Sequence, residues 1–307
     1  MGQRTVLVMA NPRRESTLRS ARQVAGRLTA AGIAVRTLAA ELNCLGAQQV
    51  PDGPDAAEGT ELVLVLGGDG TLLRAAELSR PARVPLIGAN LGHVGFLAEA
   101  EPDGLAHLVD QVVAREYRVE ERMTVDVTVC GSGSVTASTW ALNEATVEKA
   151  ARERMIELVI EVDGRPLSRW GCDGVVCSTP TGSTAYAFSA GGPVVWPEVE
   201  ALLMVPVSAH ALFARPMVVS PHSVLAVELI ERAGTPGAVM WCDGRRRVDL
   251  PPGARVEVRR GALPVLLAQL HAPESAGARF TDRLVVKFGL PVAGWRGRSE
   301  EDAGKHA

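Results

Sequence analysis

The chain has 307 residues, 47% hydrophobic and 22% charged, with a formal net charge of −3, a balance typical of one or two globular domains. This charge excludes an overall basic nucleic-acid surface, no run approaches the ~20 apolar residues of a membrane span, and five dispersed cysteines fit neither a disulfide framework nor zinc-ligand spacing. We therefore expect a cytoplasmic protein with no nucleic-acid or membrane partner and with no fixed metal site.

The N-terminal third alternates strand and helix patterns. The run at 62–66 is entirely apolar, as in a parallel strand that is buried on both faces. The pattern predicts a doubly wound α/β domain over residues 1–117. Its expected elements are strands at 5–9, 33–38, 62–66 and 84–88 and helices at about 15–31 and 71–78.

From about residue 119 the pattern changes to short β-prone runs separated by Gly, Pro or Asp. Two Asp-Gly steps, Asp163-Gly164 and Asp243-Gly244, are typical of tight hairpin turns. We expect a mostly antiparallel β domain over residues 118–272, then a C-terminal segment at 273–295 that packs back on the N-terminal domain, and a disordered tail at 296–307. The clearest β runs are 124–130, 139–147, 155–162, 174–177 and 224–228.

The most informative segment follows the apolar run at 62–66. The chain there reads Gly-Gly-Asp-Gly-Thr at residues 67–71, and a helix pattern begins immediately afterwards. Glycines let the backbone approach a ligand closely, and a helix N-terminus favours an anion. The loop lacks dinucleotide-fingerprint or Walker spacing, but Asp69 beside a phosphate site could accept the proton of an attacking hydroxyl. The alternative is that Asp69 only caps the helix at Thr71.

Two further polar segments stand out in the β-rich half. Asn143 and Glu144 are adjacent in a β-prone run, a spacing that by itself favours an exposed polar step with the two side chains on opposite faces. Residues 171–193 lead from a strand into a loop crowded with glycines and small hydroxyl residues. Such a loop can bind sugar or phosphate oxygens, but it is also common as an ordinary turn. The residues alone leave both alternatives open.

The glycine-rich segment resembles the signature shared by NAD kinases, diacylglycerol kinases, sphingosine kinases and 6-phosphofructokinases. The Asn143-Glu144 pair and the run at 171–193 resemble NAD kinases in particular, and so do residues 90–98 and 206–219. The resemblance extends from about residue 5 to residue 290. It implies that the β-rich domain binds NAD and that the chain phosphorylates the adenosine ribose 2′-hydroxyl of NAD to give NADP.

The resemblance also assigns roles to single residues. Asp69 would accept the proton of the 2′-hydroxyl, Asn143 and Glu144 would hold the adenosine, and Asp173 would contact the nicotinamide side. Arg154 and Phe96 would be further contacts, although Arg154 could equally be a solvated charge. The remaining positions are Gly70 and Arg74 lining the dinucleotide site, Thr184, Ala185, Tyr186, Ala187, Phe188 and Ser189 packing on NAD, and Gly67, Gly68, Gly70 and Thr71 forming the donor phosphate loop.

The implied chemistry is phosphoryl transfer from ATP or polyphosphate, with Mg²⁺ or another divalent cation and with a homodimer or homotetramer as the assembly. Two positions depart from the family pattern: Gly171 stands where some relatives have a basic residue, and Arg245 where relatives often have Gln. The choice between NAD and NADH therefore stays open. Two other functions compete, a lipid or sphingoid-base kinase with the same glycine loop and a non-catalytic NAD(P) sensor.

Overall fold

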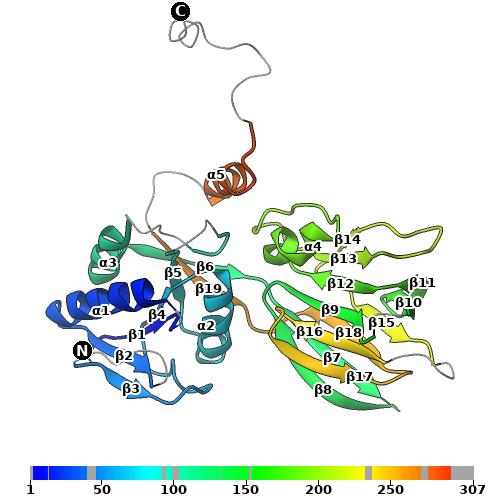
Figure 1. Ribbon diagram of the computed structural model, residues 1–307, viewed down its shortest axis with the longest axis horizontal. Coiled ribbons are helices and arrows are strands. Elements are labelled where there is room, and N and C mark those ends of the chain that lie inside the picture. The colour runs from blue at the N-terminus through cyan, green and yellow to red at the C-terminus, as the bar shows by residue number, and fades with distance from the viewer. Residues whose placement is uncertain are drawn as a thin grey trace, which may run out of the picture.

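The structure, a computed structural model, describes residues 3–12, 14–39, 46–91, 95–98, 104–131, 133–151, 154–231, 237–270 and 276–291. It has an α/β half and a β-rich half side by side (Figure 1), which confirms the predicted fold class. Among the described residues, no helix combines the length and apolarity needed to cross a bilayer. The helices are α1 (Glu15–Ala30), α2 (Asp69–Ala82), α3 (Leu105–Ala114), α4 (Tyr186–Ser189) and α5 (Ala276–Phe288), with a 3-10 turn at Thr181–Thr184.

A seven-stranded sheet in the order β3-β2-β1-β4-β5-β19-β6 forms the centre of the α/β half. All of its pairings are parallel except the one between β19 and β6. The chain leaves β1 toward β2 and β3 on one side and continues through β4 and β5 on the other. The strand order therefore reverses between β1 and β4, where open α/β sheets bind ligands at the carboxyl ends of their strands. These strands are β1 (Thr5–Ala10), β2 (Ala34–Leu38), β3 (Gln48–Val50), β4 (Leu62–Leu66), β5 (Leu86–Ala89), β6 (Tyr117–Arg122) and β19 (Val265–Leu270).

Helices cover both faces of this sheet, as the apolar run of β4 requires. All five β4 side chains are buried, and they alternate between two cores. One core contains the apolar faces of α1 and α3, and the other contains the buried face of α2. Because each core is closed by helices, β4 holds the segment that follows it at a fixed place.

Two six-stranded antiparallel sheets form the β-rich half and enclose one apolar core. The hairpin turns predicted at Asp163-Gly164 and Asp243-Gly244 are confirmed, with positive φ at all four residues. One sheet runs β11-β10-β15-β18-β7-β8 and the other β14-β13-β12-β9-β16-β17. Their strands are β7 (Val125–Gly131), β8 (Ser134–Ala141), β9 (Glu144–Lys149), β10 (Ile156–Val162), β11 (Arg165–Cys172), β12 (Gly174–Ser178), β13 (Leu202–Val207), β14 (Met217–Val219), β15 (Leu225–Leu229), β16 (Ala238–Cys242), β17 (Arg246–Leu250) and β18 (Arg255–Arg260).

The predicted domain division at 117/118 and 272/273 stays a prediction, but two strands lie in a different sheet from the one it implies. β6 and β19 pair with each other, and β19 pairs with β5, so both belong to the seven-stranded sheet. The chain enters the β-rich half after β6 and returns through β19 (Figure 1). Strand propensity reports a pleated, half-buried environment and not the sheet to which a strand belongs.

Other boundaries also differ from the predictions. The β run expected at 139–147 is two strands, because the chain leaves β8 after Ala141 and enters β9 at Glu144. The helix expected at about 71–78 is longer and begins at Asp69. In the predicted C-terminal segment, Arg279 of α5 donates to the carbonyl oxygen of Leu270 in β19 (3.1 Å). The predicted tail at 296–307 lies outside the described residues.

Candidate functional site

The glycine-rich segment lies at the point where the strand order reverses. Asn11 and Pro12 follow β1, and the glycine loop follows β4, so the two loops meet at the carboxyl edge of the sheet. A Cβ on Gly67 would lie 2.5 Å from Oγ1 of Thr71, so only glycine fits against the first turn of α2. The backbone of the loop is thereby held close to the N-terminus of α2, where unpaired N–H groups favour an anion.

Asp69 does not act as a helix cap. It is the first residue of α2, and the cap position at Gly68 has no side-chain hydrogen bond. The carboxylate instead accepts two backbone N–H groups, from Phe96 to Oδ2 (3.2 Å) and from Leu97 to Oδ1 (3.3 Å). A Cβ on Gly95 would lie 2.3 Å from Oδ1, so the turn at 95–97 fits closely around the carboxylate. Asp69 is therefore a partly exposed acid in a fixed orientation beside an anion-binding loop.

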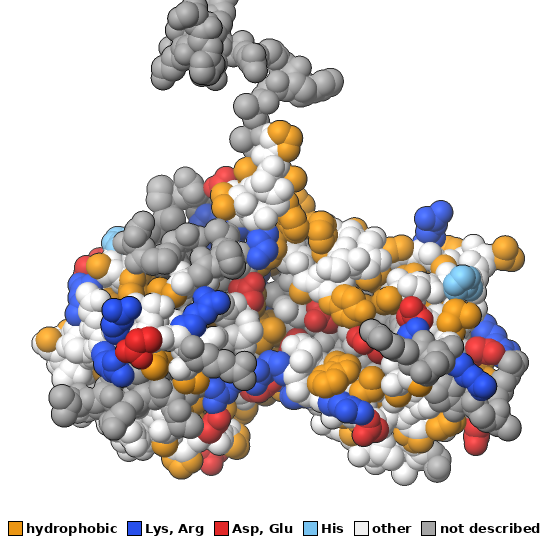
Figure 2. Space-filling view, in the orientation of Figure 1, with side chains coloured by type: hydrophobic (Ala, Val, Ile, Leu, Met, Phe, Trp, Pro, Cys, Tyr) orange, Lys and Arg blue, Asp and Glu red, His pale blue; other side chains and the backbone are white. Residues whose placement is uncertain are grey.

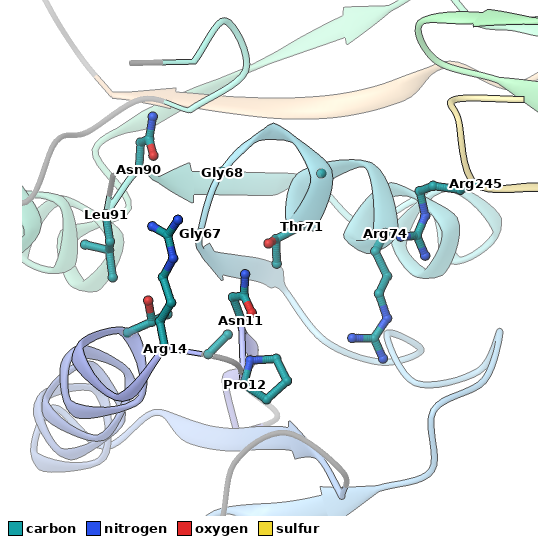
Figure 3. Close-up of a pocket in the computed structure, with 13 residues that line it drawn as sticks. Asn11, Pro12, Arg14, Gly67, Gly68, Thr71, Arg74, Asn90, Leu91 and Arg245 are labelled. Carbon is teal, nitrogen blue, oxygen red and sulfur yellow. The ribbon is translucent and has the colours of Figure 1, made fainter. Parts of the chain in front are cut away.

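A cavity of about 610 Å³ opens at this loop. Arginines approach it from three parts of the chain (Figure 3): Arg14 at the start of α1, Arg74 on α2, and Arg245 in the turn between β16 and β17. Arg74 also forms an ion pair with Asp52, and Arg245 with Glu77 (3.0 Å between Nε and Oε1). Guanidinium groups bind phosphate oxygens through several hydrogen bonds at once, so the cavity suits a polyphosphate. It is lined by Ala10, Asn11, Pro12, Arg14, Thr17, Gly67, Gly68, Gly70, Thr71, Arg74, Asn90, Leu91 and Arg245.

The Asn143-Glu144 step is buried, and the spacing argument for an exposed step is therefore wrong. Asn143 is 8% exposed and Glu144 is 7% exposed. β8 ends at Ala141 and β9 begins at Glu144, so the two side chains of the step need not point to opposite faces of one strand. Asp243 holds the backbone by accepting the N–H groups of Leu142 (3.0 Å) and Asn143 (2.7 Å). A Cβ on Gly182 would lie 2.0 Å from the carbonyl oxygen of Asn143, so the hydroxyl-rich loop packs directly on the step.

Glu144 is the most perturbed acid near the site. Burial, together with the negative charge of Asp243, raises the pKa of Glu144 to about 8. The backbone N–H of Tyr186 donates to the carboxyl group, but Oε2 has no hydrogen-bond partner within the described part of the chain. A buried polar atom without a partner is costly, so this oxygen is placed to receive a hydrogen bond from a ligand.

A second cavity, of about 350 Å³, lies over Glu144, and acidic side chains and aromatic rings line it. Its walls include Tyr186, and burial and the charges of Glu148, Glu144 and Asp173 raise the pKa of the Tyr186 phenol. Asp173 itself forms an ion pair with Lys149 (2.6 Å). The structure therefore brings Glu144, Asp173 and Tyr186 of the 184–189 run close together. The cavity is lined by Glu144, Thr146, Glu148, Tyr186, Trp241, Asp243 and Gly244.

The two cavities are neighbours, because Gly244 lines the second and Arg245 lines the first. Figure 2 shows the surface hollowed between the two halves. Glu77 of α2 binds both Arg245 and Arg246, and Arg246 also binds Asp243 (2.7 Å). The helix that begins with Asp69 is thus tied to the hairpin that holds Asn143.

Trp140 strengthens the same junction. The guanidinium of Arg80 lies 4.3 Å from the centroid of its ring and that of Arg246 lies 4.7 Å from it, which are cation–π distances. Arg80 also pairs with Asp126 of β7 (3.0 Å). These contacts join α2 to the β-rich half at several points, so the relative position of the two cavities is well defined.

Several of the predicted dinucleotide contacts do not line the cavity over Glu144. Gly70 and Arg74 line the first cavity and not the cavity over Glu144. Arg154 is exposed before β10 and lines neither cavity. In the segment at 90–98, residues 92–94 lie outside the described residues. The sequence reasoning did not identify Arg14, although its place just after the end of β1 was a usable signal once β1 and β4 were expected to be neighbours.

Within the described residues, no group of three or more His, Cys, Asp or Glu side chains is arranged to hold a metal ion. Among the described residues that line the first cavity, the polar groups are amides, hydroxyls and arginines, and none is a carboxylate. Mg²⁺ prefers one or two carboxylates together with substrate phosphates and water. The residues present therefore fit a cation that arrives bound to phosphates and touches the amide and hydroxyl oxygens of the wall, such as those of Asn11, Asn90 and Thr71.

Comparison with known proteins agrees with this geometry. A family model for the ATP-NAD kinase N-terminal domain matches residues 52–117, and one for the ATP-NAD kinase C-terminal domain matches residues 142–270. The chain is 62% identical to an NAD kinase of Thermobifida fusca, with 98% of this chain and 94% of the relative covered. It is 61% identical to NAD kinase 2 of Streptomyces coelicolor, with 96% and 97% covered.

Two solved structures show the same fold. The yeast NADH kinase complexed with NADH superposes with a TM-score of 0.82 at 22% identity, covering 97% of this chain and 91% of that one. An NAD kinase from Archaeoglobus fulgidus in complex with ATP superposes with a TM-score of 0.68 at 26% identity, covering 92% and 98%. The similarity of fold therefore extends over both halves of the chain.

Proposed function

The chain belongs to the NAD kinase family and phosphorylates NAD, and from that premise we propose that Asp69 is the general base that takes the proton of the adenosine ribose 2′-hydroxyl. One observation carries this proposal. A carboxylate fixed by two backbone N–H groups lies between two glycines that line an arginine-rich cavity. A general base must be held within hydrogen-bond reach of the proton that it removes.

The phosphoryl donor, ATP or polyphosphate, occupies the first cavity in this proposal. Arg14, Arg74 and Arg245 bind its phosphate oxygens, and the N–H groups of the glycine loop at 67–71 face the phosphate to be transferred. The reaction needs positioning and charge stabilisation more than covalent chemistry from the protein. An arginine-rich cavity beside a fixed carboxylate supplies both.

NAD occupies the cavity over Glu144. Asn143 and Glu144 hold the adenosine, the 184–189 run packs on the dinucleotide, and Asp173 lies on the nicotinamide side. The unpartnered Oε2 of Glu144 supports this placement, because a ribose hydroxyl or an adenine amino group would satisfy it. Since the cavities adjoin at Gly244 and Arg245, a hydroxyl of the bound adenosine can approach the donor phosphate.

The proposal includes further properties of the working enzyme. A divalent cation such as Mg²⁺, when bound to the donor phosphates, neutralises part of their charge. We expect a cytoplasmic homodimer or homotetramer, and Arg154 and Phe96 as additional dinucleotide contacts. Sedimentation of the purified chain tests the assembly, and titration with Mg²⁺ in the activity assay tests the cation.

An assay of NADP formation tests the function. The purified chain is incubated with Mg²⁺ and ATP or polyphosphate, and with NAD, NADH or diacylglycerol as acceptor; a dehydrogenase specific for NADP then reports phosphorylation at the 2′ position. We expect product from NAD and none from diacylglycerol. A chain that binds NAD but forms no NADP with any donor or metal would contradict the proposal and favour a sensor.

A further inference from the structure

The C-terminal helix reaches the proposed catalytic base through a single residue, Phe96. The N–H of Phe96 donates to Oδ2 of Asp69 (3.2 Å), and the carbonyl oxygen of the same residue accepts Nη1 of Arg283 in α5 (2.7 Å). Arg283 is 187 positions away from Phe96 in the chain. We infer that Arg283 of α5 is a positioning residue for Asp69, an inference that rests on the proposed function.

Aromatic packing fixes the same turn. The ring of Phe96 lies 5.9 Å from that of Phe280 and 6.0 Å from that of Phe288, both on α5, measured between ring centroids. Offset or edge-to-face rings at such distances attract each other and restrict each other's orientation. Phe280 also meets Trp196 (5.3 Å). Because Phe96 is fixed by its ring and by its carbonyl oxygen, its N–H group is held in one direction, toward Asp69.

The helix also contacts the run proposed to bind NAD. Phe288 lies 4.6 Å from Phe188 of α4, again between ring centroids. In Figure 1, α5 lies above the junction of the two halves, and in Figure 2 hydrophobic side chains run from it toward the β-rich half. One helix therefore touches the turn that holds the base and the loop that packs on the acceptor.

Charged side chains of both signs surround Arg283. Glu120, Arg122, Glu198 and Arg279 line the same small cavity as Arg283 and Phe96. Arg279 points to a different partner, since it donates to the carbonyl oxygen of Leu270 (3.1 Å) and to Gln269 (2.6 Å). The two arginines of α5 thus make comparable anchoring bonds, Arg279 to the end of β19 and Arg283 to the turn around Asp69.

Kinetics of matched variants test the inference. Arg283→Met keeps an unbranched apolar stem but removes the guanidinium donors, and it should lower kcat roughly tenfold with KM for NAD changed less than about threefold. This loss is smaller than the ~10²-fold effect of a 1 Å misplacement, because the variant loosens the turn but leaves both of its N–H donors to the carboxylate, those of Phe96 and Leu97, in the chain. Arg283→Lys, which keeps a donor, should recover part of kcat. Arg279→Met is the control and should keep kcat within about twofold.

A double-variant cycle separates positioning from mere docking of the helix. If Arg283 acts through Asp69, Arg283→Met should have no further effect on kcat in an Asp69→Asn background. A further tenfold loss in that background, an equal loss in Arg279→Met, or a wild-type kcat in Arg283→Met would overturn the inference. Failure of the proposed function would look different, because wild-type protein would then form no NADP or Asp69→Asn would keep full turnover.

Discussion

Replacing Gly95 by alanine should damage catalysis much more than stability. A Cβ at this position would lie 2.3 Å from Oδ1 and 2.9 Å from Cγ of Asp69, whereas ordinary contacts begin near 3.4 Å. The carboxylate must therefore move by about 1 Å. The backbone at Gly95 does not have a positive φ, so alanine brings no backbone strain. The displaced atoms belong to the end of a partly exposed side chain, which can turn toward water.

The size of the effect follows from this displacement. A misplacement of about 1 Å in a catalytic group can cost ~10²-fold in rate, or about 2.7 kcal/mol in the activation barrier. The hydrogen bonds from Phe96 and Leu97 to Asp69 would weaken, but because water can replace them the free energy of unfolding should fall by only about 1 kcal/mol. We therefore expect kcat for NADP formation to fall about 100-fold, with a small change in Tm.

The assay is steady-state NADP formation with saturating donor, combined with thermal unfolding of the same preparations. Gly26→Ala is the control, since Gly26 is an exposed residue of α1 whose added Cβ would meet nothing within 4 Å. This control should keep its turnover and gain slightly in stability. A folded Gly95→Ala variant with wild-type kcat would refute the placement of Asp69 as the base.

Three other variants test separate parts of the site. Because burial and Asp243 raise the pKa of Glu144 from its ordinary 4.5 to about 8, the folded chain keeps a proton that the unfolded chain has lost between these pH values. The free energy of unfolding of the wild type should therefore fall with rising pH by up to about 1.4 kcal/mol per pH unit in that window. Glu144→Gln has no proton to lose there, so its Tm should rise relative to the Tm of the wild type between pH 5 and pH 8; a difference in Tm that does not change with pH would contradict this. Arg246→Met leaves the Asp243 carboxylate, 1% exposed, without its ion pair and should cost about 3–5 kcal/mol in urea unfolding, against about 0–1 kcal/mol for Arg247→Met, whose partner Asp249 is exposed; equal costs would argue against the tie between the halves. Arg14→Gln should raise KM for ATP or polyphosphate about tenfold and leave KM for NAD within twofold, since it lines only the first cavity; a selective rise in KM for NAD would reverse the assignment of the cavities.

Local patterns in the sequence predicted the fold class well. The all-apolar run at 62–66 indicated a strand buried on both faces, and the two Asp-Gly steps indicated hairpins; both are present. In each case the signal lies within a few neighbouring residues. The membership of β6 and β19 in the first sheet could not be read in this way, because it depends on pairings between residues about 150 positions apart.

In the candidate site, too, only the features with a local sequence signal could be predicted. The glycine loop could be predicted as part of the wall of the first cavity, because its glycines are required by the conformation of the loop itself. The burial of Glu144 was not visible, since it results from Asp243 and from the loop around Gly182 packing on the step. Arg283 carried no local signal at all, because its importance comes from one bond to a carbonyl oxygen far along the chain.

The central claim is that Asp69 removes a proton from bound NAD while other residues hold the substrates. Comparison of wild type with Asp69→Asn tests it most directly, with kcat measured for NADP formation and NAD affinity measured by calorimetry. We predict a loss of kcat of about 10²–10⁴-fold, as for removal of a general base, with NAD affinity within about threefold of wild type. A variant that turns over at the wild-type rate, or that loses activity only because it no longer binds NAD, would contradict the account.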